Sequence, residues 1–395
     1  RGFNIDVNVD PADGRDDLTN LLFTNNSHNV DFTDPSKTTI FGTYTSHINI
    51  QTSSSNSLFG NDCGKNITTG NNNSSFGVTN SINLTTGNNN TSMGVDNMGT
   101  TTNSSNCIGI GHENMSLMGD NLSFNIGIGS QNCKYIKGNN NIGIGEGCLQ
   151  GKATSSDISD ESIAIGKNAG KESVGKNNNF FGTESGYQAT GSNNLGIGIH
   201  SLRRLTTGDE NIALGSWACQ GNSSVAAVNS FFHNIGIGKQ SLISLSSGSH
   251  NISLGFQTGY YNTSGTDNIF IGKEAGWINT TGSDNIFIGQ LAGKINATGS
   301  KNISIGYQAG PLLTSEINNS DRLYIDNARR GSLSLIYGNM STRNILINGS
   351  LSIAEGLSVS SSISANLIGT VTIPSSNILS LPSVENIVLS TSASN

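Results

Sequence analysis

Short apolar runs recur along the chain, and polar, glycine-rich segments separate them. In each run the apolar residues alternate with other residues, as Ile269 and Ile271 do, and Ile286 and Ile288 repeat the pattern one unit later. This period of two is typical of a half-buried β-strand, and the runs are too short for helices. The pattern therefore predicts an all-β chain that buries a thin set of apolar side chains in every repeat.

The apolar runs belong to a sequence repeat of about 17 residues. The unit at residues 268–284, NIFIGKEAGWINTTGSD, is followed directly by NIFIGQLAGKINATGSK. The intervals that end at Gly166 and Gly238 are longer, so we expect inserted loops in KATSSDISDE and NSSVAAVNSFFH. A marker glycine closes each run and defines about sixteen units: Gly42, Gly60, Gly77, Gly94, Gly111, Gly129, Gly145, Gly166, Gly182, Gly198, Gly215, Gly238, Gly255, Gly272, Gly289 and Gly306.

Each unit reads as a strand, a tight turn, a short strand and a second tight turn. Many units end in Thr-Gly-Ser-Asp or Thr-Gly-Asn-Asn, whose residues tolerate positive φ and hydrogen-bond within their own turns. Three residues after the marker glycine the side chain is mostly small, as at Ala275 and Ala292, which indicates a narrow coil with close backbone approach. Stacking such units predicts a repetitive parallel β-solenoid, or β-roll, of about sixteen coils.

The repeat divides the chain into three predicted regions. Residues 39–320 form the solenoid. Residues 1–38 contain Pro11, Pro35 and the acidic DPADGRDD run but no repeat, and we interpret them as an attachment or capping segment. From residue 321 the repeat gives way to plain strand-like alternation, as at Leu323 and Ile325, which predicts a C-terminal β stalk or trimerisation region over 321–395.

The composition argues against a globule with one large core. Only 34% of the 395 residues are hydrophobic and 12% are charged, both well below the globular average. A coil this thin has little core of its own, and oligomerisation is a usual remedy, so we expect a homotrimer. The net charge of −7 and the scattered Lys and Arg offer no footprint for nucleic acid. No stretch reaches the roughly 18 apolar residues of a membrane span, so membrane insertion is not expected.

The unit N-I-x-I-G-x-x-A-G-x-x-x-x-T-G-S-D resembles the head repeats of trimeric autotransporter adhesins, whose units are shorter. It is still more similar to the Asn-Thr-Gly-Ser-Asn repeats of phage and giant-virus tail-fibre-like proteins. Their arrays often end in a segment like DRLYIDN, here residues 321–327. The resemblance covers roughly residues 40–353 and implies a trimeric fibre of the kind that a self-cleaving intramolecular chaperone usually follows.

Together these features predict a structural fibre on a virion surface that contributes to host attachment through many weak contacts. The expected partners are other copies of the chain, other virion proteins and a host surface glycan or protein receptor. We expect no enzyme activity and no cofactor. A cellular trimeric adhesin or sheath protein is the alternative. A glycan-cleaving fibre enzyme is a weaker one, because nothing in the sequence pairs two carboxylates.

Aromatic residues close to the marker glycines or turns are the candidate contacts with a target. Aromatic rings stack on sugars and anchor protein interfaces, whereas most repeats carry polar or small residues here. Packing between neighbouring coils or protomers is an equally open explanation. The candidate binding residues are Tyr187, Trp217, Tyr260, Tyr261, Trp277 and Tyr307.

Two further sets of polar residues recur with the repeat. The acids Asp209, Asp267 and Asp284 occupy the same turn of three different units. The spacing of calcium-binding β-rolls is missing, so turn capping is favoured and no metal site is predicted. The five cysteines have no metal-ligand spacing and are expected to be small buried residues. Three sequons one unit apart are possible glycosylation sites: Asn262, Asn279 and Asn296.

Overall fold

The computed structural model describes residues 4–8, 20–24, 30–32, 39–42, 48–50, 55–151, 159–222 and 229–352. The chain divides into two compact units, Arg1–Gly349 and Ser350–Asn395, and the description below concerns the first. Most of the predicted stalk, parts of the two predicted loops and much of the predicted N-terminal segment lie outside the described residues.

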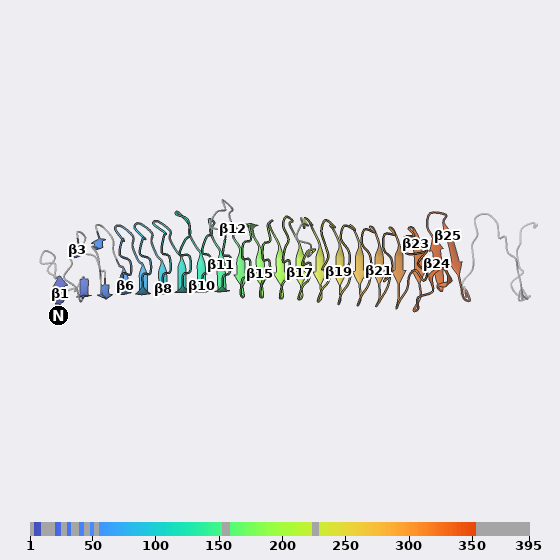
Figure 1. Cartoon of the computed structure of the whole chain (residues 1–395), viewed down its shortest axis with the longest axis horizontal. Helices are drawn as coiled ribbons and strands as arrows, with labels where there is room; N and C mark the ends of the chain where they lie inside the picture. The colour runs from blue at the N-terminus through green and yellow to red at the C-terminus, as the bar shows by residue number, and fades with distance from the viewer. Residues whose placement is uncertain are drawn as a thin grey trace, which may run out of the picture. The chain divides into compact units, whose positions relative to one another are not determined.

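One sheet of 21 strands runs through the first unit. From β2 to β23 each strand pairs in parallel with the next strand of this sheet, so the prediction of a parallel β-solenoid is confirmed, with about 15 turns. Figure 1 shows β6 to β22 in one row, each joined to the next by a loop that returns to the same sheet. The strands are β1 (Asn4–Asn8), β2 (Asn20–Thr24), β4 (Thr39–Gly42), β6 (Ser57–Asn61), β7 (Ser74–Val78), β8 (Thr91–Val95), β9 (Ile108–His112), β10 (Ile126–Ser130), β11 (Ile142–Glu146), β13 (Ile163–Ile165), β15 (Asn179–Phe181), β16 (Leu195–Ile197), β17 (Ile212–Leu214), β18 (Ile235–Ile237), β19 (Ile252–Leu254), β20 (Ile269–Ile271), β21 (Ile286–Ile288), β22 (Ile303–Ile305), β23 (Arg322–Ile325), β24 (Ile336–Asn339) and β25 (Asn344–Ile347).

The second strand that the sequence predicts in each unit is mostly absent from the described coils. Two short sheets, β3 (Val30–Phe32) with β5 (Ile48–Ile50) and β12 (Ser159–Asp160) with β14 (Gly175–Lys176), are the exceptions, with three isolated bridges. Elsewhere this part of the coil is turn, because positive φ angles recur at every second residue, as at Gly272, Glu274 and Gly276. Its backbone still hydrogen-bonds from coil to coil.

A ladder of buried asparagines runs along the interior, one at the start of most strands. Asn268 Nδ2 donates to Oδ1 of Asn251 at 3.0 Å and to the carbonyl of Gly282 at 2.9 Å. In turn, Oδ1 of Asn268 accepts the backbone N–H and the Nδ2 of Asn285, each at 3.0 Å. Buried amides are stable only when such bonds are made, so each coil fixes the register of the next. The ladder comprises Asn56, Asn73, Asn90, Asn125, Asn141, Asn178, Asn194, Asn211, Asn234, Asn251, Asn268, Asn285 and Asn302.

In many coils a large apolar side chain enters the core from one of two positions. In some coils the middle residue of the strand is large, as Phe287 is, and the residue six positions later is glycine. A side-chain carbon added at Gly293 would lie 2.4 Å from the Phe287 ring. In other coils the strand carries glycine, as at Gly236, and Leu242 occupies the core instead, with φ of 51°. These two positions do not both carry a large side chain in any described coil, although some coils bury a further apolar residue, such as Leu245 in the coil of Leu242.

The sheet extends beyond both predicted boundaries of the solenoid. At the N-terminal side, β1 pairs antiparallel with β2, and β2 pairs in parallel with β4. At the other end, β23 continues the parallel stack, and β24 and β25 add an antiparallel meander, with a 3₁₀ helix at Gly331–Leu333 before β24. The first compact unit consequently ends at Gly349 and not at residue 320.

Candidate functional site

The outer face of the large sheet carries two rows of apolar side chains, which we name the apolar stripe. From β4 to β22 the first and third residues of each strand of the large sheet, such as Ile286 and Ile288, point outward, while the residue between them, such as Phe287, is buried. In β23 the equivalent outward residues are Leu323 and Ile325. The expectation that the alternating isoleucines form the buried side is therefore wrong for the single chain. Stripe residues that are 36–48% exposed are Phe41, Phe76, Met93, Ile165, Ile197, Ile237, Ile252, Ile288 and Ile305.

The apolar stripe contains no charged residue. From β9 to β23 its two rows hold only isoleucine, leucine, Phe181 and Asn179. Soluble surfaces normally interrupt so long an apolar row with charge, since exposed apolar patches promote association. The small middle residue in many strands, as at Gly127 and Gly143, was the sequence signal for this orientation, because only small groups fit the narrow interior of those coils.

The apolar stripe continues onto the C-terminal meander. Strand pairing aligns Ile325 with Ile336 and then with Ile347, so the outward row passes from β23 through β24 to β25. Every residue of β25 is exposed, including Ile345 at 70% and Leu346 at 50%, which point to opposite faces. A strand with both apolar faces in solvent is incompletely packed in one chain.

The six predicted aromatic contacts separate into two groups. Tyr261 and Tyr307 are 42% and 48% exposed, respectively. The others are half-buried, namely Tyr187, Trp217, Tyr260 and Trp277. Cations from the following coil cover three of these rings: Arg203 lies over Tyr187, Lys239 over Trp217 and Lys294 over Trp277, at 5.1–5.5 Å. Packing between coils therefore accounts for most of these aromatic residues.

Three of the aromatics form one cluster with an ion pair. Tyr261 meets Tyr260 and Trp277 edge-on, at centroid distances of 4.7 and 5.1 Å. Lys294 Nζ lies 2.8 Å from Oε2 of Glu274. This hydrogen bond from Lys294 holds the pKa of the Glu274 carboxyl below its ordinary value. The cluster joins three successive coils through rings and charges.

A second cluster surrounds Trp217. Glu184 Oε2 forms an ion pair with Arg203, 2.8 Å from its Nε, and lies 3.4 Å from His200 Nε2. The His200 ring packs edge-on against Trp217. Burial and the charge of Arg203 lower the pKa of His200, so the neutral imidazole is favoured here. One carboxylate is thus shared by two neighbouring side chains from the next coil, which favours a packing role.

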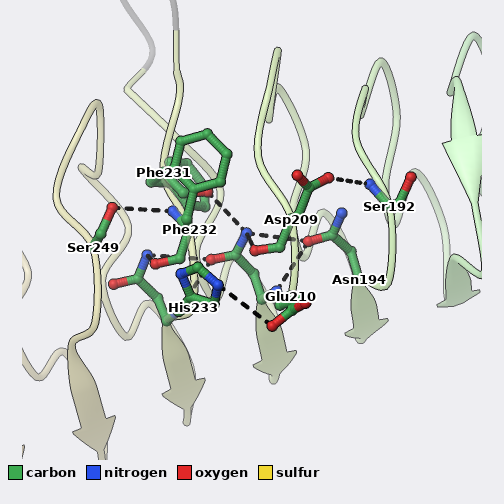
Figure 2. A network of polar contacts seen from close by, with 10 residues as sticks. Ser192, Asn194, Asp209, Glu210, Phe231, Phe232, His233 and Ser249 are labelled. Atoms are coloured by element: carbon green, nitrogen blue, oxygen red, sulfur yellow. Dashed lines mark hydrogen bonds and ion pairs between the residues drawn. The ribbon is translucent and has the colours of Figure 1, made fainter.

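Polar side chains of the turns bond along the coils, as Figure 2 shows for residues 192–249. Asp209 accepts the backbone N–H of Ser192 at 2.5 Å, and Ser249 accepts that of Phe232 at 3.2 Å. His233 lies 3.4 Å from Glu210 and stacks on His250 at 4.8 Å. The described residues contain no group of three or more His, Cys, Asp or Glu that could hold a metal ion.

The three sequon asparagines lie inside the coil. Asn262, Asn279 and Asn296 are 0% exposed. Asn296 Nδ2 donates to Oδ1 of Asn279 at 2.9 Å and to the carbonyl of Gly299 at 2.8 Å. A glycan on these side chains is incompatible with the folded coil, because it would break these bonds and needs solvent space.

The cysteines are buried thiols, as predicted for small residues within a repeat. Burial raises the pKa of Cys107 and Cys148 to about 11 and that of Cys219 to about 12. These thiols are therefore protonated at neutral pH and are poor nucleophiles, because the thiolate is the reactive form.

Among the described residues, no helix is long and apolar enough to cross a membrane. Comparison of the chain with known protein families, curated proteins and solved structures finds no match. The features of its own surface therefore carry the functional argument, and the apolar stripe is the most extensive of them.

Proposed function

We propose that this chain is a structural fibre protein that self-associates along the apolar stripe and attaches to a host surface through its remaining faces. The observation that carries the proposal is the uncharged, outward-facing stripe, which a single chain leaves in solvent. Another copy of the same chain offers a stripe of equal length and equal coil spacing.

The dimensions of the apolar stripe support self-association. Adjacent strands lie about 4.8 Å apart, so the rows from β9 to β23 extend over roughly 60 Å and are roughly 10 Å wide. This footprint of roughly 600 Å² lies at the upper end of the range of about 300–600 Å² for the largest apolar patch on a monomer, and it approaches the ~800 Å² per partner of stable interfaces. Three copies are the expected number, because the resembling fibres and adhesins are trimers.

Attachment in this proposal is multivalent. Identical chains in one assembly repeat each exposed contact, and weak contacts made together reach an avidity that exceeds any one of them. The resemblance of the repeats to viral tail-fibre-like proteins is the reason for proposing a virion surface as the site of action.

The native mass of the protein tests self-association. We expect light scattering to give about three times 41.2 kDa, and we expect this mass to survive mild heating in detergent. A mass of one chain would contradict the proposal.

Charge placed in the apolar stripe should dissociate the assembly without unfolding the coil. We expect Ile237→Glu combined with Ile288→Glu to give single chains, because both side chains point outward and two carboxylates would be buried unpaired in the interface. The matched control is Phe256→Glu, an exposed aromatic outside the stripe, which should leave the mass unchanged. Assembly of the double variant would show that another surface holds the chains together.

Host attachment is tested separately on a glycan array and on host-type membranes. The assembled protein should bind, and the dissociated stripe variant should bind at least tenfold more weakly, because it loses avidity. Equal binding by both forms, or by neither, would contradict multivalent attachment.

A further inference from the structure

A cleft of about 440 Å³ lies at the C-terminal end of the solenoid. Ligand-binding clefts in proteins commonly have volumes of about 300–1,000 Å³. The cleft forms where the regular repeat ends, because the chain after Gly310 leaves the path followed by the earlier coils. Its lining residues are Leu291, Lys294, Gln308, Leu312, Ala328 and Arg329.

One wall of the cleft is held by a carboxylate that points into backbone. Glu316 Oε2 accepts the N–H groups of Leu312 at 2.8 Å and Leu313 at 3.3 Å. These bonds fix the conformation of the loop that carries Leu312. The carboxylate of Glu316 is thereby bound by backbone N–H groups of its own loop.

The two cations of the cleft differ in their partners. Lys294 is paired with Glu274 at 2.8 Å and covers the Trp277 ring. Arg329 is exposed, and no side chain in the described ranges forms an ion pair or hydrogen bond with it. The neighbouring Arg330, by contrast, lies 3.5 Å from Asp326. The cleft therefore presents one uncompensated guanidinium, a group that binds carboxylates in a bidentate manner.

The rest of the cleft suits a small ring with hydroxyl groups. Leu291 and Leu312 supply apolar walls, and Gln308 supplies an amide at the opening. Gln308 Nε2 donates to the hydroxyl of Tyr307 at 3.2 Å, which holds this exposed ring beside the cleft. Amide and phenol groups hydrogen-bond sugar hydroxyls, and an exposed ring can stack on a sugar face.

We propose that this cleft binds a carboxylate-bearing sugar residue, with Arg329 holding the carboxylate and Gln308 and Tyr307 contacting the ring hydroxyls. This inference rests on the proposed role in host attachment and names an acidic glycan as the surface ligand. It assigns to the C-terminal end of the solenoid a specific contact that the repeated coils lack.

Calorimetric titration of the full chain with glucuronate, glucose and acetate tests the cleft. We expect glucuronate to bind at least tenfold more tightly than either glucose or acetate, because glucose lacks the carboxylate and acetate lacks the sugar ring. Arg329→Gln should weaken glucuronate binding at least tenfold. Arg330→Gln is the matched control and should leave it unchanged, because Arg330 already has Asp326 as its partner.

Two results would overturn the assignment. Equal affinity for glucuronate in Arg329→Gln would remove the guanidinium from the site, and equal affinity for acetate would show anion binding without sugar recognition. The native mass of the same samples separates this test from the proposed function, because no stripe residue lines the cleft. Normal assembly without glucuronate binding contradicts only the cleft, and binding by single chains contradicts only the self-association.

Discussion

At the scale of single residues, a large core side chain comes from either of two positions in many coils. Phe287 fills the core from the strand, whereas Leu242 fills it from the turn opposite Gly236. Where one of the two positions carries a large side chain the other is small, and interiors packed at crystal-like density require such compensation.

Exchange of the two positions in one coil should therefore be tolerated. We expect Phe287→Gly alone to cost about 3 kcal/mol or more through a cavity, and Gly293→Leu alone to destabilise by steric overlap with Phe287. The double variant recreates the arrangement of Gly236 and Leu242 and should recover at least half of the loss. Circular dichroism during thermal unfolding measures the loss of stability in each variant. A double variant that loses as much stability as the two single variants together would contradict the exchange.

The Glu274 ion pair predicts a dependence of stability on pH. Lys294 lowers the pKa of Glu274 in the folded chain, so the unfolded chain binds this proton more readily. The pair therefore stabilises the fold above the ordinary carboxyl pKa of about 4.3, and this contribution is lost as the pH falls through the lower folded value. We expect Glu274→Gln to flatten the fall of the thermal midpoint below about pH 4.5.

The control for the ion pair is Glu146→Gln. Glu146 lies 3.1 Å from Lys167, but their side chains are 60% and 58% exposed, and exposed pairs contribute little to stability. The thermal midpoint of this variant should fall at acidic pH as steeply as that of the unchanged protein. An equally steep fall of the thermal midpoint at acidic pH in Glu274→Gln would argue against the Lys294 pair as a source of stability.

At the scale of the elements, the asparagine ladder sets the register of neighbouring strands. Each rung bonds the backbone N–H of the residue that follows it in the stack, and many rungs also bond its side chain, as Asn268 does with Asn285. A slip of one residue would turn the stripe rows inward and the buried middle residues outward. In the strands that it joins, the ladder therefore favours the register in which the stripe rows face solvent.

Removal of one rung should destabilise its two neighbours. Asn268→Ala leaves the N–H of Asn285 and the carbonyl of Gly282 without these partners, and buried unsatisfied groups cost about 1–3 kcal/mol each. We expect a loss of about 2–4 kcal/mol in the free energy of unfolding of that segment, measured by hydrogen exchange. Thr281→Ala, at an exposed position of the turn that follows, should change it by less than about 0.5 kcal/mol.

At the scale of the whole first unit, each coil contacts mainly the coils before and after it. Strand pairing in the large sheet joins sequence neighbours throughout the described strands, and no strand bridges distant coils. Stability in such stacks is a sum of coil and nearest-neighbour contributions. Damage in one coil should therefore remain local.

The effect of Asn268→Ala should be confined in this way. We expect faster amide exchange in β19 to β22 and unchanged exchange in β7 to β9, because these strands share no contact with the altered rung. Mass spectrometry of peptides from both regions measures it at a fixed protein concentration, which keeps self-association constant. Equally accelerated exchange in both regions would indicate a single cooperative unit.

The solenoid could be predicted from the sequence because its cause is local and repeated. The marker glycines adopt positive φ, as Gly289 does at 127°, and an added side-chain carbon there would lie 2.5 Å from the carbonyl of Gly306. Close stacking therefore requires glycine in every unit, and this requirement is visible as a period. The buried small residues three positions after the marker glycine, and the buried cysteines, follow from the same close approach of neighbouring coils.

The sequon asparagines and the aromatic residues could not be placed in this way. A sequon records only neighbouring residues, whereas burial of Asn279 depends on Asn262 and Asn296 in the adjacent coils. Likewise, Trp277 is covered because Lys294 reaches it from the next coil. Such contacts are set by stacking, and the position of a residue within its own unit does not reveal them.

The sequence by itself determined that the chain is a parallel β-solenoid, because turn glycines, small residues and alternating strands recur with one period. Only the tertiary structure decided which side of each strand is inside. Both sides are uncharged, and the choice depends on the narrow interior, which accepts the asparagine ladder and a large side chain at only one of the two core positions. The isoleucine rows are therefore left on the outside, where a second copy of the chain can cover them.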